Sequence, residues 1–280
     1  MSELLFERVV KVNIADNLLE DYDCEFEVVR TLEPEPNTAK IKVYNLPTEL
    51  RAACQGSSEK DKAAVSITVG YKRTAGQVFV GDVRYAPSAV VGADWVTIIE
   101  AGDGEKDYKN AQVALTWSKG KQVSKVVEEI LDTFDNLLPG DFAKTVKAKL
   151  KEQFPRGGAL SGNAVRVMDE LVRGYGFRFS IQDGQFQFVD ATGQNQKTAV
   201  VLSPDSGLIG EPELGEKDKK TGKAKGKVKS LLQPSIIPGS VIDVQGTSTI
   251  KGQFIVQKVT HEGNNGFNTP FYSNMEILTK

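Results

Sequence analysis

The chain of 280 residues is 40% hydrophobic and 26% charged and has a formal net charge of −2. This composition is typical of a globular protein with a buried core, and the length predicts roughly one to three domains. A net charge this close to zero excludes a global electrostatic attraction to nucleic acid or to anionic membranes. Any function that depends on positive charge must therefore rest on a local cluster of basic residues.

The cysteines and the N-terminus indicate the cellular compartment. Cys24 and Cys54 are the only cysteines, too few for a disulfide framework, and this favours a reducing compartment. The N-terminal stretch MSELLFERVVKVNIAD lacks the basic and then apolar layout of a signal peptide. No apolar run approaches the roughly 20 residues that a membrane helix needs. We therefore expect synthesis in a cytoplasm and no insertion into a membrane.

Residues 1–111 are predicted to form a β-rich part. Apolar and polar side chains alternate along its strands, as where Ile41 and Val43 alternate with Lys40 and Lys42. A short helix is expected at 47–54, with Pro47 at a tolerated first-turn position. The predicted strands cover residues 6–14, 24–32, 39–44, 65–71, 77–83 and 95–101.

The pattern changes to a helical period in the middle of the chain. Apolar residues spaced by three and four predict amphipathic helices over 121–134, with Ser118 as a candidate N-cap, and over 161–174. A weaker helix is expected at 142–150. Aromatic residues alternate on both sides of Asp183-Gly184, which predicts a β-hairpin over 177–189. Residues 112–192 are therefore expected to form a small α/β domain.

The last third, 193–280, returns to short β-branched segments separated by Pro-Gly and Asn-Gly, which is typical of a small antiparallel β-barrel. Within it, residues 215–229 carry no large apolar side chain before Val228 and are predicted to form a long mobile loop. This run has three interpretations: a solvated hairpin tip, a contact with an acidic protein surface, or a nucleic-acid contact that lacks aromatic residues for base stacking. The candidate protein-contact residues are Lys217, Lys219, Lys220, Lys223, Lys225, Lys227 and Lys229.

No motif in the chain predicts catalysis, and we expect no catalytic, cofactor-binding or metal-binding residue. His261 is the only histidine and lies in an alternating run, where a structural or surface role is expected. One histidine and two distant cysteines give no zinc spacing, and no Gly-x-Ser-x-Gly turn presents a nucleophilic serine. Asp103 and Asp183 fall in predicted turns without the spacing of a calcium loop.

Segments along most of the chain resemble the baseplate hub, or late-control, proteins of tailed phages. The resemblance rests on the order and spacing of segments, not on any chemical signature. The segments include TLEPEPNTAKIKVYNLPTELR, SITVGYKRTAGQVFVGDV, LSGNAVRVMDELVRGYGFRFSIQDGQFQFV, LSPDSGLIGEPE and SLLQPSIIPGSVIDV.

The resemblance implies a β-rich α+β fold, in which two tail-tube-like antiparallel β-barrel domains, 1–111 and 193–280, flank the α/β domain 112–192. It also implies a virion structural protein without enzymatic activity. Such hub proteins form homotrimers whose six barrels make a pseudo-sixfold ring, a symmetry adaptor between a hexameric tail tube and a trimeric central spike. Expected partners are the tube or tube-initiator protein and the spike, with tape-measure and baseplate wedge proteins as further candidates. A contractile tail is favoured.

Two other functions remain open from the sequence. A tail-associated peptidoglycan hydrolase would need paired carboxylates in a cleft, and 37 acidic residues always offer pairs. A nucleic-acid-binding module on an OB-like barrel would bind in a salt-dependent way.

Overall fold

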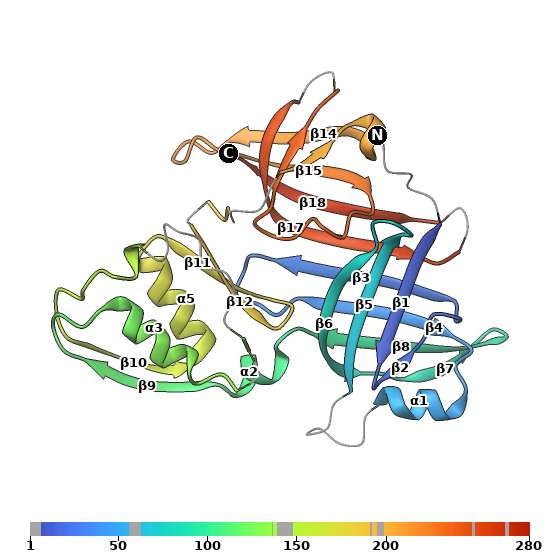
Figure 1. The fold of residues 1–280 in the computed structure, drawn as a ribbon, viewed down its shortest axis with the longest axis horizontal. Coiled ribbons are helices and arrows are strands. Elements are labelled where there is room, and N and C mark those ends of the chain that lie inside the picture. The colour runs from blue at the N-terminus through green and yellow to red at the C-terminus, as the bar shows by residue number, and fades with distance from the viewer. Residues whose placement is uncertain are drawn as a thin grey trace.

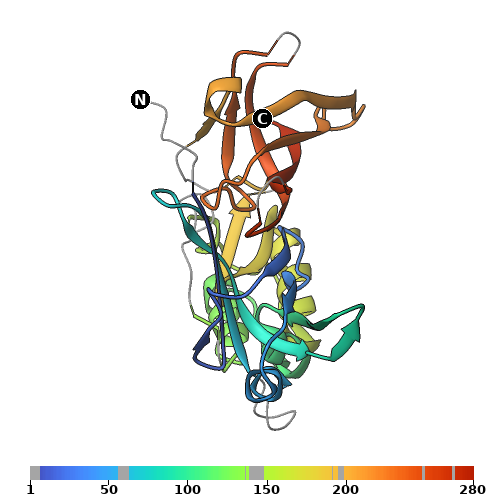
Figure 2. The same ribbon diagram turned by 90° about the vertical axis from the view of Figure 1, so that its right-hand side faces the viewer.

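The computed structural model describes residues 7–55, 63–135, 137–138, 148–190, 192–194, 199–247, 250–266 and 269–280. Its dominant feature is a 14-stranded sheet that runs from the C-terminal strands to the N-terminal strands (Figure 1). Seen from the side, the C-terminal strands lie at one end of the molecule and the N-terminal strands at the other (Figure 2). The main path is β14 (Leu208–Lys217), β15 (Ala224–Leu231), β18 (Phe271–Thr279), β17 (Gly252–Asn264), β3 (Cys24–Thr31), β4 (Thr38–Tyr44), β8 (Asp94–Gly102), β6 (Gly76–Tyr85), β5 (Ala64–Tyr71), β1 (Arg8–Ile14) and β2 (Asn17–Leu18).

Three further strands join this sheet away from the main path. β7 (Ser88–Val91) pairs with β8, β16 (Val241–Val244) pairs with β17, and β13 (Val200–Leu202) pairs with β16. The β13–β16 pair is parallel, whereas every other strand pair in the described residues is antiparallel. The predicted strand-rich, predominantly antiparallel fold is therefore confirmed, with this one parallel pair as the exception.

The hairpin of β17 and β18 joins the two β-rich parts. The first part of β17 pairs with β16, and the second part, from Lys258 to Asn264, pairs with β3, while β18 follows β17 on its other side. At the far end of the sheet, Arg8 of β1 reaches back to this hairpin, donating hydrogen bonds to the carbonyl oxygens of Gly266 (2.9 Å) and Thr269 (2.9 Å). The N-terminal strands thus curl around one apolar core, which includes Phe271 of β18. A separate core lies under the C-terminal strands.

A smaller α/β unit packs beside the sheet and has its own apolar core. We use this name for β9 (Gln112–Trp117), α3 (Val123–Leu131), β10 (Gly158–Asn163), α5 (Ala164–Gly174), β11 (Phe177–Gln182) and β12 (Gln185–Asp190). Outside it lie α1 (Thr48–Gln55), α2 (Glu105–Asn110) and the 3₁₀ turn η1 (Pro204–Ser206).

Both strong helical predictions in this unit are confirmed, but their starts differ. α3 begins after Gln122, and Ser118 does not cap it, because the chain from Ser118 to Gln122 turns before the helix begins. α5 begins later than predicted because 161–163 belong to β10, and the side chain of Asn163 caps the helix by accepting from the Arg166 N–H. Most of the weak helix expected at 142–150 lies outside the described residues.

The expectation of a long mobile loop at 215–229 is wrong. β14 extends to Lys217 and β15 begins at Ala224, so only 218–223 form a turn. β15 pairs with β14 on one side and with β18 on the other, which satisfies its backbone without large apolar side chains. The positions of β15 that point inward are small or medium-sized: Ala224, Val228 and Ser230 are buried.

A buried polar junction ties the α/β unit to the sheet. We use this name for Arg30, Asn37, Asp103, Gln182 and Asp183. The Asp103 carboxylate accepts hydrogen bonds from the backbone N–H groups of Asp183 (2.7 Å) and Gly184 (2.8 Å), in the turn between β11 and β12. Burial raises the pKa of Asp103 to about 6.

The Arg30 guanidinium occupies the centre of this junction. It is 1% exposed and donates to the Asp183 carboxylate (2.7 Å), to the Gln182 side chain (3.3 Å) and to the Val78 carbonyl of β6 (3.2 Å). One side chain of β3 therefore holds together β3, β6 and the β11–β12 turn. Because each of its three nitrogens has an acceptor and one acceptor is a carboxylate, the buried charge is compensated.

Candidate functional site

One face of the large sheet carries many polar side chains. In a strand, successive side chains point to opposite faces, and in β3 the residues Cys24, Phe26, Val28 and Arg30 are buried whereas the alternating positions are not. The same alternation continues across β4, β17, β18 and β15. The outward side chains form what we call the charged face: Glu100, Lys40, Lys42, Glu25, Glu27, Lys258, Glu262, Glu276, Lys225, Lys227, Lys229, Glu211 and Glu213.

Opposite charges face each other across many neighbouring strands of this face. Lys42 of β4 bonds Glu25 of β3 (3.0 Å), and Lys258 of β17 lies 3.5 Å from Glu276 of β18. The Lys42 contact lowers the pKa of the Glu25 carboxyl, and the Glu25 contact raises the pKa of the Lys42 ammonium. The thirteen residues of the charged face comprise seven glutamates and six lysines, so the face carries almost no net charge.

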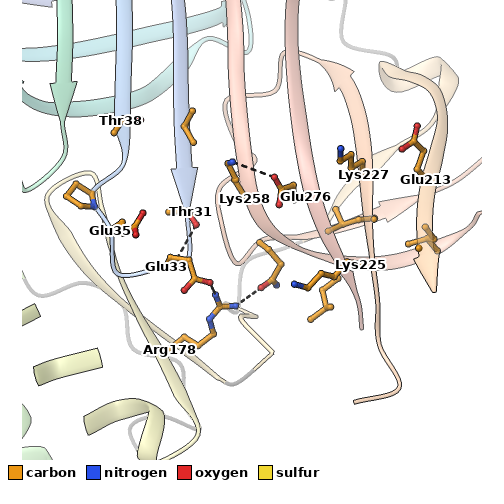
Figure 3. Close-up of a pocket in the computed structure, with 18 of the residues that line it drawn as sticks. Thr31, Glu33, Glu35, Thr38, Arg178, Glu213, Lys225, Lys227, Lys258 and Glu276 are labelled. Atoms are coloured by element: carbon orange, nitrogen blue, oxygen red, sulfur yellow. Dashed lines mark hydrogen bonds and ion pairs between the residues drawn. The ribbon is translucent and has the colours of Figure 1, made fainter. Parts of the chain in front are cut away.

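The charged face is hollowed where it meets the α/β unit. A groove of about 1090 Å³ lies over β3, β17, β18, β15 and β14. Figure 3 shows side chains that line it. Glu33 follows β3 at its rim and accepts from Arg173 (3.2 Å) and Arg178 (2.5 Å) of the α/β unit. Arg178 also donates to the side chain of Gln257 in β17 (2.5 Å). These contacts fix the rim of the groove by joining three parts of the fold.

The seven lysines predicted as contact residues lie in two different places in the structure. Lys225, Lys227 and Lys229 lie on β15 and belong to the charged face, with Lys229 stacked over the Tyr272 ring at 4.0 Å. Lys217 ends β14, and the others lie in the following turn: Lys219, Lys220 and Lys223. The charged face was not predicted, although its signal was present in the sequence: Glu25 and Glu27 alternate with apolar residues in β3, as do Lys40 and Lys42 in β4.

The single histidine and both cysteines lie in the core. His261 is fully buried, its Nδ1 is 2.8 Å from the Ser273 hydroxyl, and burial lowers its pKa to about 3. The thiols are also buried, which raises the pKa of Cys24 to about 12 and that of Cys54 to about 11. The described part of the chain brings together no group of three metal-ligating His, Cys, Asp or Glu side chains. It also contains no helix that is both long and apolar enough to span a membrane.

No protein-family model matches this sequence, and no curated protein matches it in sequence. Solved structures do match, over nearly the whole chain. A tail protein from Neisseria meningitidis MC58 is 8% identical with a TM-score of 0.68, and the match covers 98% of this chain and 97% of that one. The 43 kDa tail protein of prophage MuSo2 from Shewanella oneidensis is 8% identical with a TM-score of 0.64, covering 96% of each chain.

A third match is a component of the type VI secretion system from E. coli, described as structurally similar to the bacteriophage T4 tail proteins gp27 and gp5. It is 12% identical with a TM-score of 0.65, and the match covers 95% of this chain and 76% of that one. At these identities the comparison establishes the fold. The resemblance to phage tail hub proteins is thus confirmed at the level of the fold: this chain has the β-rich α+β fold of phage tail proteins from end to end.

Proposed function

We propose that this protein is a structural hub subunit of a phage tail or of a related tail-like particle, and that it is not an enzyme. The observation that carries the proposal is the match to a tail protein over 98% of this chain and 97% of the other. The burial of His261, Cys24 and Cys54 agrees with a scaffold role.

In the proposed assembly the chain divides into a barrel domain at 1–111, an α/β domain at 112–192 and a second barrel domain at 193–280. Three copies form a ring in which six barrels create pseudo-sixfold symmetry. The ring then adapts a hexameric tail tube, or its initiator, to a trimeric central spike. Three apolar cores support this division, although the core of the first part also takes in Leu232 and Phe271 from the last. The matching type VI secretion component and the VgrG complexes among the structural neighbours support a spike-type partner.

We place the charged face on the inside of this ring, where it would line a channel. Its hollowed form and its lack of net charge fit a wall past which polymers move without binding. The location is then the baseplate of a virion tail, assembled in a bacterial cytoplasm. Tape-measure and baseplate wedge proteins are further partners, and a contractile tail remains our expectation.

We also propose that the lysines of 217–229 contact an adjacent tail protein. Replacing all seven by serine tests this, because the strands pair through their backbones and should persist. We expect normal circular dichroism and reduced incorporation into tails. Incorporation at the normal level would show that these lysines make no such contact.

The experiment that tests the hub itself measures the mass of the chain in solution and its symmetry in assembled tails by electron microscopy. We expect a trimer in the particle at the end of the tube. A sixfold ring of this chain, or its absence from the particle, would refute the proposal. Clearing in a peptidoglycan zymogram would favour the hydrolase, and salt-dependent retardation of nucleic acid in a gel would favour the OB-like module.

A further inference from the structure

Four lysines lie at the end of the hairpin formed by β14 and β15, and we call them the lysine tip: Lys217, Lys219, Lys220 and Lys223. In the described residues none of these four side chains forms an ion pair, although exposed lysines elsewhere do, such as Lys42 with Glu25 (3.0 Å). Only two acidic residues lie beside them in the chain, Glu216 and Asp218. The lysine tip therefore carries a local excess of positive charge that the fold itself does not neutralise.

Asp218 holds the turn that carries these lysines in one conformation. Its carboxylate accepts hydrogen bonds from the backbone N–H groups of Lys220 (2.9 Å) and Thr221 (2.8 Å) and from the Thr221 hydroxyl (3.1 Å). The backbone closes the turn as well, because the Asp218 N–H donates to the Lys223 carbonyl (2.8 Å) and the Gly222 N–H donates to the Asp218 carbonyl (2.8 Å). The lysines are thus presented on an ordered turn, which lowers the conformational entropy that is lost on binding.

The turn lies beyond the last paired residues of the sheet. β15 begins at Ala224, whose N–H donates to the hydroxyl of Thr279 (2.9 Å) at the end of β18, and the pairing of β15 with β18 starts one residue later. Residues 217–222 are all exposed. Figure 2 shows the orange hairpin of β14 and β15 reaching out from the C-terminal strands. A neighbouring molecule can therefore contact the lysine tip without covering the charged face.

The backbone of this turn does not offer a phosphate site. Phosphate-binding turns direct several backbone N–H groups at the bound anion. Here the N–H groups of Lys220 and Thr221 already point at the Asp218 carboxylate, so an anion of the chain itself occupies that place. These hydrogen bonds lower the pKa of Asp218, which keeps its carboxylate negative and repels a phosphate.

The side chains of the turn fit carboxylates better than nucleic acid. Residues 216–223 include no arginine for bidentate phosphate contacts and no aromatic residue for stacking on bases. Their cationic groups are four separate ammonium groups on flexible stems. Because each acts as a point charge without a fixed direction of approach, together they suit carboxylates spread over a protein surface.

We propose that the lysine tip binds a patch of Asp and Glu side chains on the adjacent tail protein, and that Asp218 orders the turn for this contact. The inference rests on the proposed function, which places a tail protein beside residues 217–229, and it names the chemistry of the partner surface and the lysines that bind it. Lys227 and Lys229 are not part of the contact, since Lys227 lies opposite Glu276 in the sheet and Lys229 stacks over the Tyr272 ring.

The first test couples lysines to carboxyl groups in assembled tails. A water-soluble carbodiimide joins a lysine and a carboxyl group that are in contact through an amide bond and takes up the water that is lost, and mass spectrometry of the digested tails locates the link. We expect links from the lysine tip to Asp or Glu of another tail protein. The pairs Lys42–Glu25 and Lys258–Glu276 are the internal control, because they should link within this chain. Internal links without a link from the lysine tip to another protein would overturn the inference.

The second test removes the charge of the lysine tip and compares the result with an equal loss of charge elsewhere. The tip variant combines Lys217→Gln, Lys219→Gln, Lys220→Gln and Lys223→Gln. The control variant changes four lysines that already pair with acidic residues of this chain: Lys11→Gln, Lys72→Gln, Lys121→Gln and Lys125→Gln. In tails assembled from equal amounts of parent and variant chains, we expect at least about fivefold less of the tip variant and equal amounts of the control variant, because several lysine–carboxylate pairs are lost together. Equal incorporation of both variants would overturn the inference, and a defect in the seven-serine variant alone would leave the proposed lysine contact intact.

Two comparisons test the carboxylate chemistry and the role of Asp218. Labelled duplex DNA, followed by fluorescence anisotropy, should bind the parent and the tip variant equally, and a tenfold loss in the tip variant would reassign the tip to phosphate. Asp218→Asn keeps a side-chain oxygen that can accept from the turn, whereas Asp218→Ala removes it, and both variants lose the same charge. We expect only Asp218→Ala to lower incorporation, by at least about twofold, and equal incorporation of the two variants would overturn the role of Asp218. Absence of the parent chain from assembled tails would overturn both this contact and the hub.

Discussion

The attachment of the α/β unit to the sheet depends on Arg30, and Arg30→Met tests it. The side chain of methionine fills a similar volume but provides no donor for the Asp183 carboxylate, the Gln182 side chain or the Val78 carbonyl. All three acceptors lose the donor from Arg30, but Gln182 keeps its bond from Asn37 (3.1 Å), so the loss matters most at Asp183 and Val78. We therefore expect the loss to fall mainly on the charged pair.

The structure sets the magnitude of this loss. Removing one partner of a buried ion pair costs about 3–5 kcal/mol, because the other charge is left uncompensated. The side chain of Asp183 is 32% exposed, so water can replace part of the lost interaction. We expect about 2–3 kcal/mol. Asp183→Asn in the same chain should reduce the cost of Arg30→Met by at least about 1 kcal/mol, since no carboxylate is then left alone. Asparagine also tolerates the positive φ of 53° at this turn position.

The two tryptophans allow each side of the junction to be observed separately. Trp95 lies on β8 of the sheet and Trp117 on β9 of the α/β unit. Urea unfolding is followed by tryptophan fluorescence in two single-tryptophan variants. Trp95→Phe leaves Trp117, which reports the α/β unit, and Trp117→Phe leaves Trp95, which reports the sheet. We expect Arg30→Met to lower the midpoint reported by Trp117 more than that reported by Trp95. A loss below about 0.5 kcal/mol, or equal shifts of both midpoints, would refute the reasoning.

Three further measurements follow from buried titratable groups. The pKa of Asp103 in the folded protein, about 6, lies above its ordinary value of 3.8, so the contribution of Asp103 to stability is present at low pH and is lost as pH rises through 6. In urea unfolding, the parent should therefore lose up to about 3 kcal/mol of stability relative to Asp103→Asn between pH 4 and 7. A difference between the two proteins that stays constant with pH would contradict this. Cys24 and Cys54, with raised pKa values, should react with a thiol reagent at pH 8 only after unfolding, and rapid native labelling would argue against their burial. His261, with a pKa of about 3, should give an NMR signal that does not shift between pH 5 and 8.

Local periodicity predicted most of the elements, because it reports directly which face of an element is buried. The alternation at Lys40 and Lys42 identified β4, and apolar residues spaced by three and four identified α3 and α5. Asp183-Gly184 identified the β11–β12 turn, where both residues take the positive φ that the turn requires. The composition of 215–229 led to the wrong prediction of a loop, since a strand that is paired on both sides needs few apolar side chains.

The pairing of distant strands could not be predicted in this way. β3 and β17 are separated by more than 200 residues, and the alternating pattern of each strand does not indicate which strand pairs with it. The charged face depends on that pairing. The polar junction depends on other distant contacts, those of Arg30 with Val78, Gln182 and Asp183. Asp103 illustrates the difficulty: its turn position was visible in the sequence, whereas its acceptor role toward the N–H groups of the β11–β12 turn arises only in the folded chain. The division into domains at 111 and 192 stays a prediction.

The spacing of charges on the charged face bears on what the proposed channel could conduct. Exposed pairs such as Lys42–Glu25 contribute little to stability, so stability alone does not account for their arrangement. Neighbouring strands lie about 4.8 Å apart, which is less than the screening length of about 8 Å at physiological salt. The fields of opposite rows therefore cancel before they are screened, and a polymer one screening length from the wall meets almost no potential. A row of lysines alone would hold a polyanion by releasing its counterions, and a row of glutamates alone would repel it. In the proposed ring, the pairing of Lys with Glu across most of these strands thus favours passage over binding; Glu27 of β3 opposite Glu262 of β17 is the exception.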